Sequence, residues 1–182
     1  MNTQALHSLN MAFSSGAPTA SGAAATLTTT AAVDATVKGV WATQVAAEAK
    51  TLAAVTTEGV SSADATGYAA TTFSALYGGA STNAAAPANN DGQACLLVHC
   101  TNAAGEVKSI QGASVQLDAS GNLLKAAEFP VIPDTLTPFC YQLLKAGLTA
   151  GDITPATSNW NSTGFTNSIT NIAVLPNRPV TS

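Results

Sequence analysis

Short runs of apolar and β-branched residues, separated by turn sequences, dominate the chain after Gly92. Successive side chains of a strand point to opposite faces, and runs of this length bounded by turn residues predict β-strands. The clearest predicted strands are "ACLLVHCT", "VKSIQG", "TPFCYQLLKAG" and "FTNSITNIAVLP". Because "NAAGE" joins the first two, they are expected to form a β-hairpin. Residues 93–182 are therefore predicted to form an antiparallel β-sandwich or barrel-like domain, in a chain that is mainly β.

Two further segments of this domain contain turn-forming or strand-breaking residues. "VQLDASGN" predicts a turn at Ala119–Asn122. "FPVIPD" contains Pro130 and Pro133, which fix φ and remove two backbone donors. We therefore expect an extended crossing segment rather than a central strand. Such a segment can bridge two sheets or follow the edge of a subunit.

The first 92 residues have weaker patterns and are divided into two regions. Residues 1–30 are of low complexity with few large apolar groups, and they predict an extended N-terminal arm that becomes ordered against another subunit. Residues 31–92 predict a mixed, loop-rich β region. A strand is expected from Val33 to Gln44, although "WATQVAAEAKTLAAV" also suits a helix. "ATTFSALYGG" predicts a short helix that ends at Gly78.

The low charge of the chain changes the expected surface. Only 9% of the residues are charged, against roughly 25% in typical soluble domains. A surface of Ala, Thr, Ser, Gly and Asn is expected to be buried against other subunits. The net charge is −4 and the six basic residues are scattered, which argues against binding to nucleic acid or to anionic membranes. The sequence has no apolar stretch of about 18 residues, so no membrane-spanning helix is expected.

The compartment follows from the cysteines and the N-terminal sequence. "MNTQALHSLNMAF" lacks the basic and apolar regions of a secretory signal, so we expect synthesis in the cytoplasm of the producing cell. Three cysteines cannot all form intrachain disulfides, and free thiols are expected in a reducing compartment. The glycosylation pattern at Asn161–Thr163 is discounted for the same reason.

"CLLVHC", residues 95–100, is the strongest candidate for a metal or catalytic site. On a strand, Cys95 and His99 share one face and Cys100 lies on the other, so the two cysteines cannot bind one ion together. Cys95 and His99 are also too far apart along the strand to share a hydrogen bond. Cys140 could approach His99 from a neighbouring strand. We expect buried cysteines that act as small hydrophobes, a partly exposed His99 and no metal site.

Other catalytic patterns are weak. The sequence contains neither G-x-S-x-G nor a glycine-rich phosphate loop. Most of the ten acidic residues lie beside turn residues, as in "LDASGN". We therefore expect a protein that is not an enzyme and has no cofactor. A small hydrolase is the alternative, and it would need two carboxylates about 5–10 Å apart in a pocket.

Several segments occur in a fixed order between Cys95 and Pro179. They are "GEVKSIQG" with "VQLDASGN", "FPVIPDTLTPFCYQLLKAG" and "SNWNSTGFTNSITNIAVLPNRP". In their order and spacing, the C-terminal half resembles tailed-bacteriophage virion proteins of the capsid decoration or head fibre type. The resemblance implies a structural role on the capsid surface, with the major capsid protein and sister subunits as partners. By analogy with other virion proteins it implies a homo-oligomer, with a trimer expected. It carries over no catalytic residue.

Four residues are candidate assembly contacts: Trp160, Arg178, Pro130 and Pro133. Trp160 either closes one end of a sandwich, with its indole N–H bonded to backbone, or anchors a subunit contact. Arg178, the only arginine, can brace its own chain or bind a carboxylate of another subunit.

The expected function is capsid decoration or cementing. Many weak, neutral contacts repeated by symmetry give high avidity and should resist salt. A tail or fibre component that binds a host receptor is the alternative, and a bacterial surface adhesin is a further one.

Overall fold

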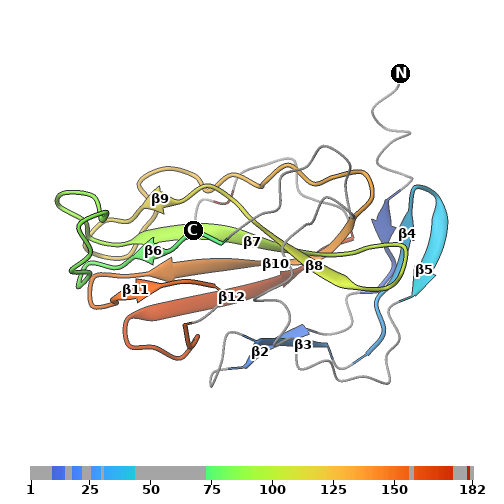
Figure 1. Ribbon diagram of the computed structural model, residues 1–182, viewed down its shortest axis with the longest axis horizontal. Helices are drawn as coiled ribbons and strands as arrows, with labels where there is room; N and C mark the ends of the chain where they lie inside the picture. The colour runs from blue at the N-terminus through green and yellow to red at the C-terminus, as the bar shows by residue number, and fades with distance from the viewer. Residues whose placement is uncertain are drawn as a thin grey trace.

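The computed structural model describes residues 10–14, 18–21, 26–29, 31–43, 73–155, 158–173 and 180. Within them the chain forms twelve β-strands and no helix, and every strand pair is antiparallel (Figure 1). The strands are β1 (Met11–Ala12), β2 (Pro18–Ser21), β3 (Thr26–Thr29), β4 (Asp34–Val37), β5 (Val40–Thr43), β6 (Leu76–Tyr77), β7 (Gln93–Thr101), β8 (Val107–Gln111), β9 (Val115–Gln116), β10 (Thr137–Ala146), β11 (Asp152–Ile153) and β12 (Phe165–Asn171). The predicted mainly β, antiparallel class is confirmed, and the sheets formed by these residues are open rather than closed into a barrel.

The largest sheet has the strand order β12-β10-β7-β8, and β9 pairs with the beginning of β7. All nine residues of β7 are buried, and β10 is nearly as buried. Both faces of these central strands are therefore covered, which explains why β7 is an almost continuous apolar run rather than an alternating one. The hairpin predicted from "NAAGE" is confirmed as the β7–β8 pair.

One face of the sheet packs against elements from the N-terminal half. Cys95, Leu97 and Leu144 on this face share a buried cluster with Ala12 and Leu76. The other face is covered by the chain between β8 and β10. Here Phe129 and Ile132 pack on Val98, Cys100 and Ile110. The prediction that "FPVIPD" crosses the sheet without joining it is thus confirmed. The predicted turn at Ala119–Asn122 is confirmed as well, because Leu117 and Leu123 pair on either side of it.

Proline also lies inside β10, at Pro138. The pairing of β10 with β7 shifts register between Pro138 and Cys140, so the residue that cannot donate to the ladder is at an irregularity. This is where a strand tolerates proline.

Two predictions for the middle region are corrected. The expected strand from Val33 to Gln44 is a hairpin, β4–β5, whose turn residues Lys38 and Gly39 have positive φ of 51° and 77°. The expected helix at "ATTFSALYGG" is wrong where the structure describes it, because Leu76–Tyr77 is strand β6, paired with β11. Leu76 is fully buried, and pairing with β11 places it in the core, so tertiary packing outweighs local helix propensity.

The described part of the N-terminal arm lies on the chain's own β domain. β1 pairs with β4, and the Ala12 N–H donates to the Ala173 carbonyl beyond the end of β12 at 3.0 Å. β2 and β3 form a hairpin, and β2 contacts β12. In Figure 1 this hairpin lies below the large sheet. The arm is therefore extended in conformation and also folded back.

Candidate functional site

His99 lies at the centre of the large sheet and is fully buried, so the expectation of a partly exposed histidine is wrong. Its Cα is paired with Ser109 on one side and with Cys140 on the other. Nδ1 of His99 lies 2.8 Å from the Ser109 hydroxyl, and Nε2 lies 2.9 Å from Oε1 of Gln142. Because an amide oxygen only accepts, Nε2 carries the proton and Nδ1 accepts from Ser109. Nε2 of Gln142 has no hydrogen-bond partner in the part of the chain that the structure describes.

This environment makes the imidazole and the thiols poor catalysts. Burial lowers the pKa of His99 from 6.5 to about 4, opposed in part by the hydrogen bond to Gln142. Burial also raises the pKa of Cys95 to about 12, with the hydrogen bond from Gln111 acting in the opposite direction. The pKa values of Cys100 and Cys140 are likewise raised by burial. A nucleophilic cysteine must form the thiolate, which burial disfavours in all three cysteines. A general base must reach the substrate, and His99 is fully buried.

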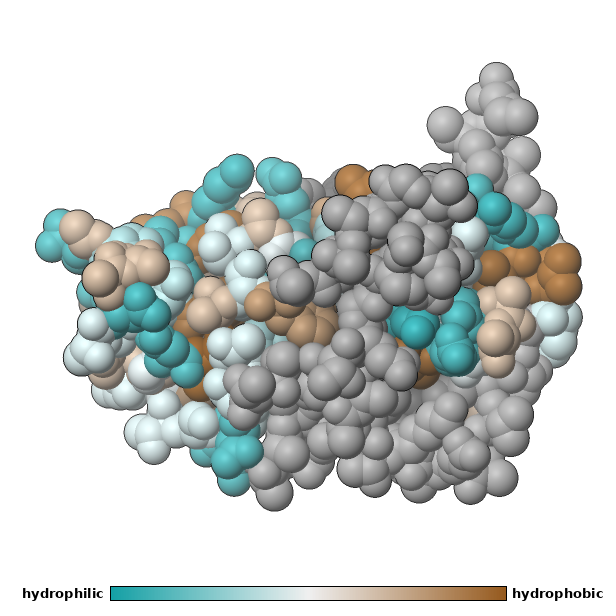
Figure 2. All heavy atoms as spheres, in the orientation of Figure 1, coloured by the Kyte–Doolittle hydropathy of each residue, from teal (hydrophilic) through white to brown (hydrophobic). Residues whose placement is uncertain are grey.

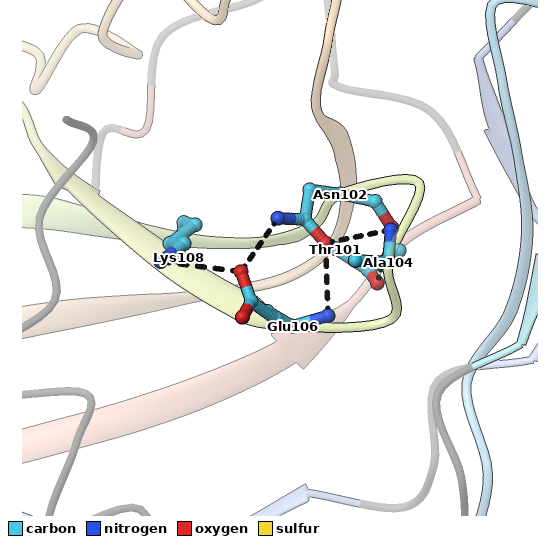
Figure 3. Close-up of polar contacts among 5 residues, drawn as sticks. All are labelled: Thr101, Asn102, Ala104, Glu106 and Lys108. Carbon is cyan, nitrogen blue, oxygen red and sulfur yellow. Dashed lines mark hydrogen bonds and ion pairs between the residues drawn. The ribbon is translucent and has the colours of Figure 1, made fainter. Parts of the chain in front are cut away.

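The β7–β8 turn is organised by the side chain of Asn102 (Figure 3). Its Oδ1 accepts from the backbone N–H groups of Ala104 and Glu106 at 3.0 and 2.9 Å, and its Nδ2 donates to the Glu106 carboxylate at 2.9 Å. Lys108 lies 3.5 Å from the same carboxylate. The Glu106 carboxylate is therefore bound by Asn102 and Lys108 of the same hairpin. Such contacts stabilise a turn and are not the environment of a catalytic carboxylate.

The sequence-based assembly candidates fall in different places. Trp160 is only 3% exposed and belongs to the buried cluster under the large sheet, and its indole N–H has no hydrogen-bond acceptor among the described residues. Pro130 and Pro133 are half-buried in the crossing segment, and the Pro133 carbonyl accepts from Leu136 at 3.1 Å. Arg178 lies outside the described residues. Among the three described candidates, the structure does not place Trp160 beside Pro130 and Pro133.

A different set of residues forms an exposed apolar surface. Phe13, Val40 and Trp41 are 57%, 65% and 60% exposed. The rings of Phe13 and Trp41 are stacked, with centroids 5.2 Å apart and an interplanar angle of 21°. We call the stacked pair of Phe13 and Trp41 the aromatic patch. Val40 precedes Trp41 on β5, so its side chain points to the opposite face of the strand. Figure 2 shows hydrophobic residues gathered at the end of the molecule that carries β4 and β5. Large apolar side chains grouped in this way mark contact surfaces.

The aromatic patch is held in place by polar contacts around the β4–β5 turn. The Asn10 side chain accepts from the Lys38 N–H at 2.6 Å and donates to the Asp134 carbonyl at 2.8 Å. Nζ of Lys38 lies 3.3 Å from the Asp134 carboxylate, and both side chains are exposed. Phe13 itself is tied to β4 through its N–H, which donates to the Asp34 carbonyl at 2.7 Å. The rings are thus presented by a fixed backbone, which lowers the entropy cost of a contact.

A second surface feature lies between β9 and the segment 124–128. The two segments are close where Leu117 pairs with Leu123 and where Leu124 donates to the Gln116 carbonyl at 3.0 Å. The chain just before β9 also lies close to the segment 124–128. At Gly112, an added Cβ would lie 2.8 Å from the Glu128 carbonyl oxygen. Between these points is a groove of about 420 Å³, which we call the apolar groove. Its described lining is Ala113, Ser114, Val115, Gln116, Leu124, Lys125, Ala126 and Glu128.

Sequence reasoning missed both features. Phe13 lies in the low-complexity segment predicted to be an extended arm, and Trp41 lies where the sequence suits either a strand or a helix. A lone large aromatic in a low-complexity stretch was the available signal for Phe13. The apolar groove had no local signal, because its two sides meet only after the turn at Asp118–Asn122 is formed.

A metal-binding cluster and a membrane-spanning helix are both absent within the described residues. No group of three or more His, Cys, Asp or Glu side chains there is placed to hold a metal ion. No helix in the same part of the chain is long and apolar enough to span a bilayer. Comparison of the chain with protein-family models, with curated proteins and with solved structures found no match.

Proposed function

We propose that this chain is a structural virion protein of a tailed bacteriophage, which decorates or cements the capsid through subunit–subunit contacts. The observation that carries the proposal is the aromatic patch, in which Phe13, next to β1, stacks on Trp41 of β5 and both side chains are more than half exposed. Burying such groups against a partner yields roughly 25 cal/mol for each Å² removed from water. The resemblance of the C-terminal half to decoration and head fibre proteins supports the same role.

The chain's composition supports a contact of this kind. With 9% charged residues, most contacts that its surface can make are apolar or between neutral polar groups. Such contacts are not screened by salt, and repetition over a symmetric shell multiplies their effect. A protein held by charge pairs would instead be released as the ionic strength rises.

The interior supports a role other than catalysis. Within the described residues, the side chains best suited to general base or nucleophilic chemistry are His99, Cys95, Cys100 and Cys140, and all four are buried in the large sheet. Their hydrogen bonds and apolar packing are used to hold strands together. The chain would then act through its surface alone.

The proposal is tested on virions that carry the chain. Gold-labelled antibody against the protein should decorate heads, and the protein should stay with the particles from 0.1 to 1 M NaCl at neutral pH. The variant Phe13→Ser/Trp41→Ser should rebind stripped particles at least tenfold more weakly, whereas Leu148→Ser, which changes a half-exposed residue outside the patch, should rebind normally. Label confined to the tail would replace the proposal with the receptor-binding alternative, and release in moderate salt would contradict it.

A further inference from the structure

The aromatic patch and the apolar groove lie at different ends of the molecule. β5, which carries Val40 and Trp41, is at one end of the long axis, and β9, which forms one side of the groove, lies toward the other (Figure 1). The patch protrudes on a hairpin, whereas the groove is recessed between two segments. A single chain therefore carries a projecting apolar surface and a receding one that it cannot bring together.

We propose that the aromatic patch of one copy of this chain docks in the apolar groove of a second copy, so that copies associate head to tail. The groove, at about 420 Å³, has the size of a site for a small ligand and can receive aromatic side chains. The apolar side chains that line the groove are Ala113, Val115, Leu124 and Ala126. Leu124 is 67% exposed. Aromatic anchors that fill apolar pockets carry most of the energy of such contacts.

The charges beside the two surfaces are complementary. Lys38 and Asp134 flank the patch as an exposed ion pair, 3.3 Å apart. Lys125 and Glu128 flank the groove as another, 3.6 Å apart. Exposed pairs of this kind contribute little within one chain. When the patch enters the groove, Lys38 can bind Glu128 of the second copy while Asp134 binds Lys125, and this sets the orientation of the contact.

The contact uses two different surfaces, so it is heterologous. Each copy keeps one unused patch or groove, and association continues into a ring or an open row of subunits. A contact of two patches across a two-fold axis would leave the groove empty and stop at a dimer. The inference names the sister-subunit contact within the proposed function. Its test uses the purified chain alone, so that its failure leaves attachment to a capsid untouched.

The decisive experiment is mixing of two variants in sedimentation velocity. Trp41→Ser removes the main anchor, and Ala126→Lys places a charged chain in the groove. The wild-type protein should form species larger than dimers, and each variant alone should need at least tenfold higher concentration to associate. Mixed in equal amounts, the two should form a 1:1 heterodimer and nothing larger, because one intact groove meets one intact patch. Circular dichroism checks that both variants are folded.

A charge exchange gives a second test that leaves each exposed ion pair intact within its own chain. Lys125→Glu/Glu128→Lys should weaken association, as should Lys38→Glu/Asp134→Lys, because each reverses one side of the contact. The protein with all four changes should regain the wild-type association constant within about threefold. This arm does not depend on burying or removing an apolar side chain.

Three results would overturn the inference. One is a wild-type protein that stays monomeric at millimolar concentration. Another is the Ala126→Lys variant forming dimers as tightly as the wild type, which is the outcome of a patch-to-patch contact. The third is a mixture of the two variants that contains monomers only.

Discussion

Nε2 of His99 on β7 lies 2.9 Å from Oε1 of Gln142 on β10, at the centre of the large sheet and out of contact with water. Ser109 on β8 binds the other ring nitrogen at 2.8 Å, so one neutral imidazole joins three strands. Burial disfavours the charged imidazolium form of His99, and the hydrogen bond to Gln142 opposes this only in part. The sheet is thus held at its centre by a group that must stay neutral.

The first prediction concerns acid. The pKa of His99 is about 4 in the folded protein and about 6.5 when exposed, so the unfolded state binds more protons between these values. The contribution of His99 to stability should therefore be constant above pH 6.5 and should decrease as the pH drops toward 4, by about 3 kcal/mol in total. Urea unfolding at several pH values measures this change. His99→Gln, which keeps hydrogen-bonding groups but does not titrate, should show a clearly smaller decline over the same range, and an equal decline would contradict the assignment.

The second prediction concerns the thiols. Cys95, Cys100 and Cys140 are buried and protonated at neutral pH, because burial raises the pKa of each. A thiol reagent such as DTNB should therefore label native protein no faster than the protein opens, and should label three thiols per chain in denaturant. Cys95→Ser should leave two groups in the denatured count. Fast labelling of the native protein at pH 7 would contradict the burial of these three thiols in the sheet.

The third prediction concerns the β7–β8 turn. Asn102→Ala removes three side-chain hydrogen bonds from a turn in which Gly105 has φ of 79°. We expect the free energy of unfolding to decrease by about 1–2 kcal/mol, since each exposed hydrogen bond contributes modestly. Chemical denaturation measures the change. Ala103→Ser, an exposed position in the same turn, should change stability by less than about 0.5 kcal/mol.

The fourth prediction concerns the start of β7. Gly92 has φ of 127°, and an added Cβ would lie 2.2 Å from the Ala146 carbonyl oxygen. Gly92→Ala should therefore destabilise the protein by on the order of 3 kcal/mol, through backbone strain and a clash with the end of β10. Gly151→Ala is the matched control, because a Cβ there meets no atom within 4 Å and its φ is not in the left-handed region. The thermal midpoint of each variant provides the comparison, and a Gly92→Ala protein as stable as the control would show that this strand end can move.

The sequence by itself determined the four longest strands of the C-terminal half, the turns at Asn102–Glu106 and Ala119–Asn122, and that "FPVIPD" stays outside the sheet. The short strands β9 and β11 were not predicted. The predicted features depend on local causes. Side chains alternate between the faces of a strand, turn residues reverse the chain direction, and prolines have no backbone N–H to donate. Only the tertiary structure decided that His99 is buried between Ser109 and Gln142, because its partners come from strands 10 and 43 residues away. The same holds for Leu76, which is drawn into a strand by β11, and for the stacking of Phe13 on Trp41. Burial and exposure are properties of the assembled sheets, and a residue's neighbours in sequence do not set them.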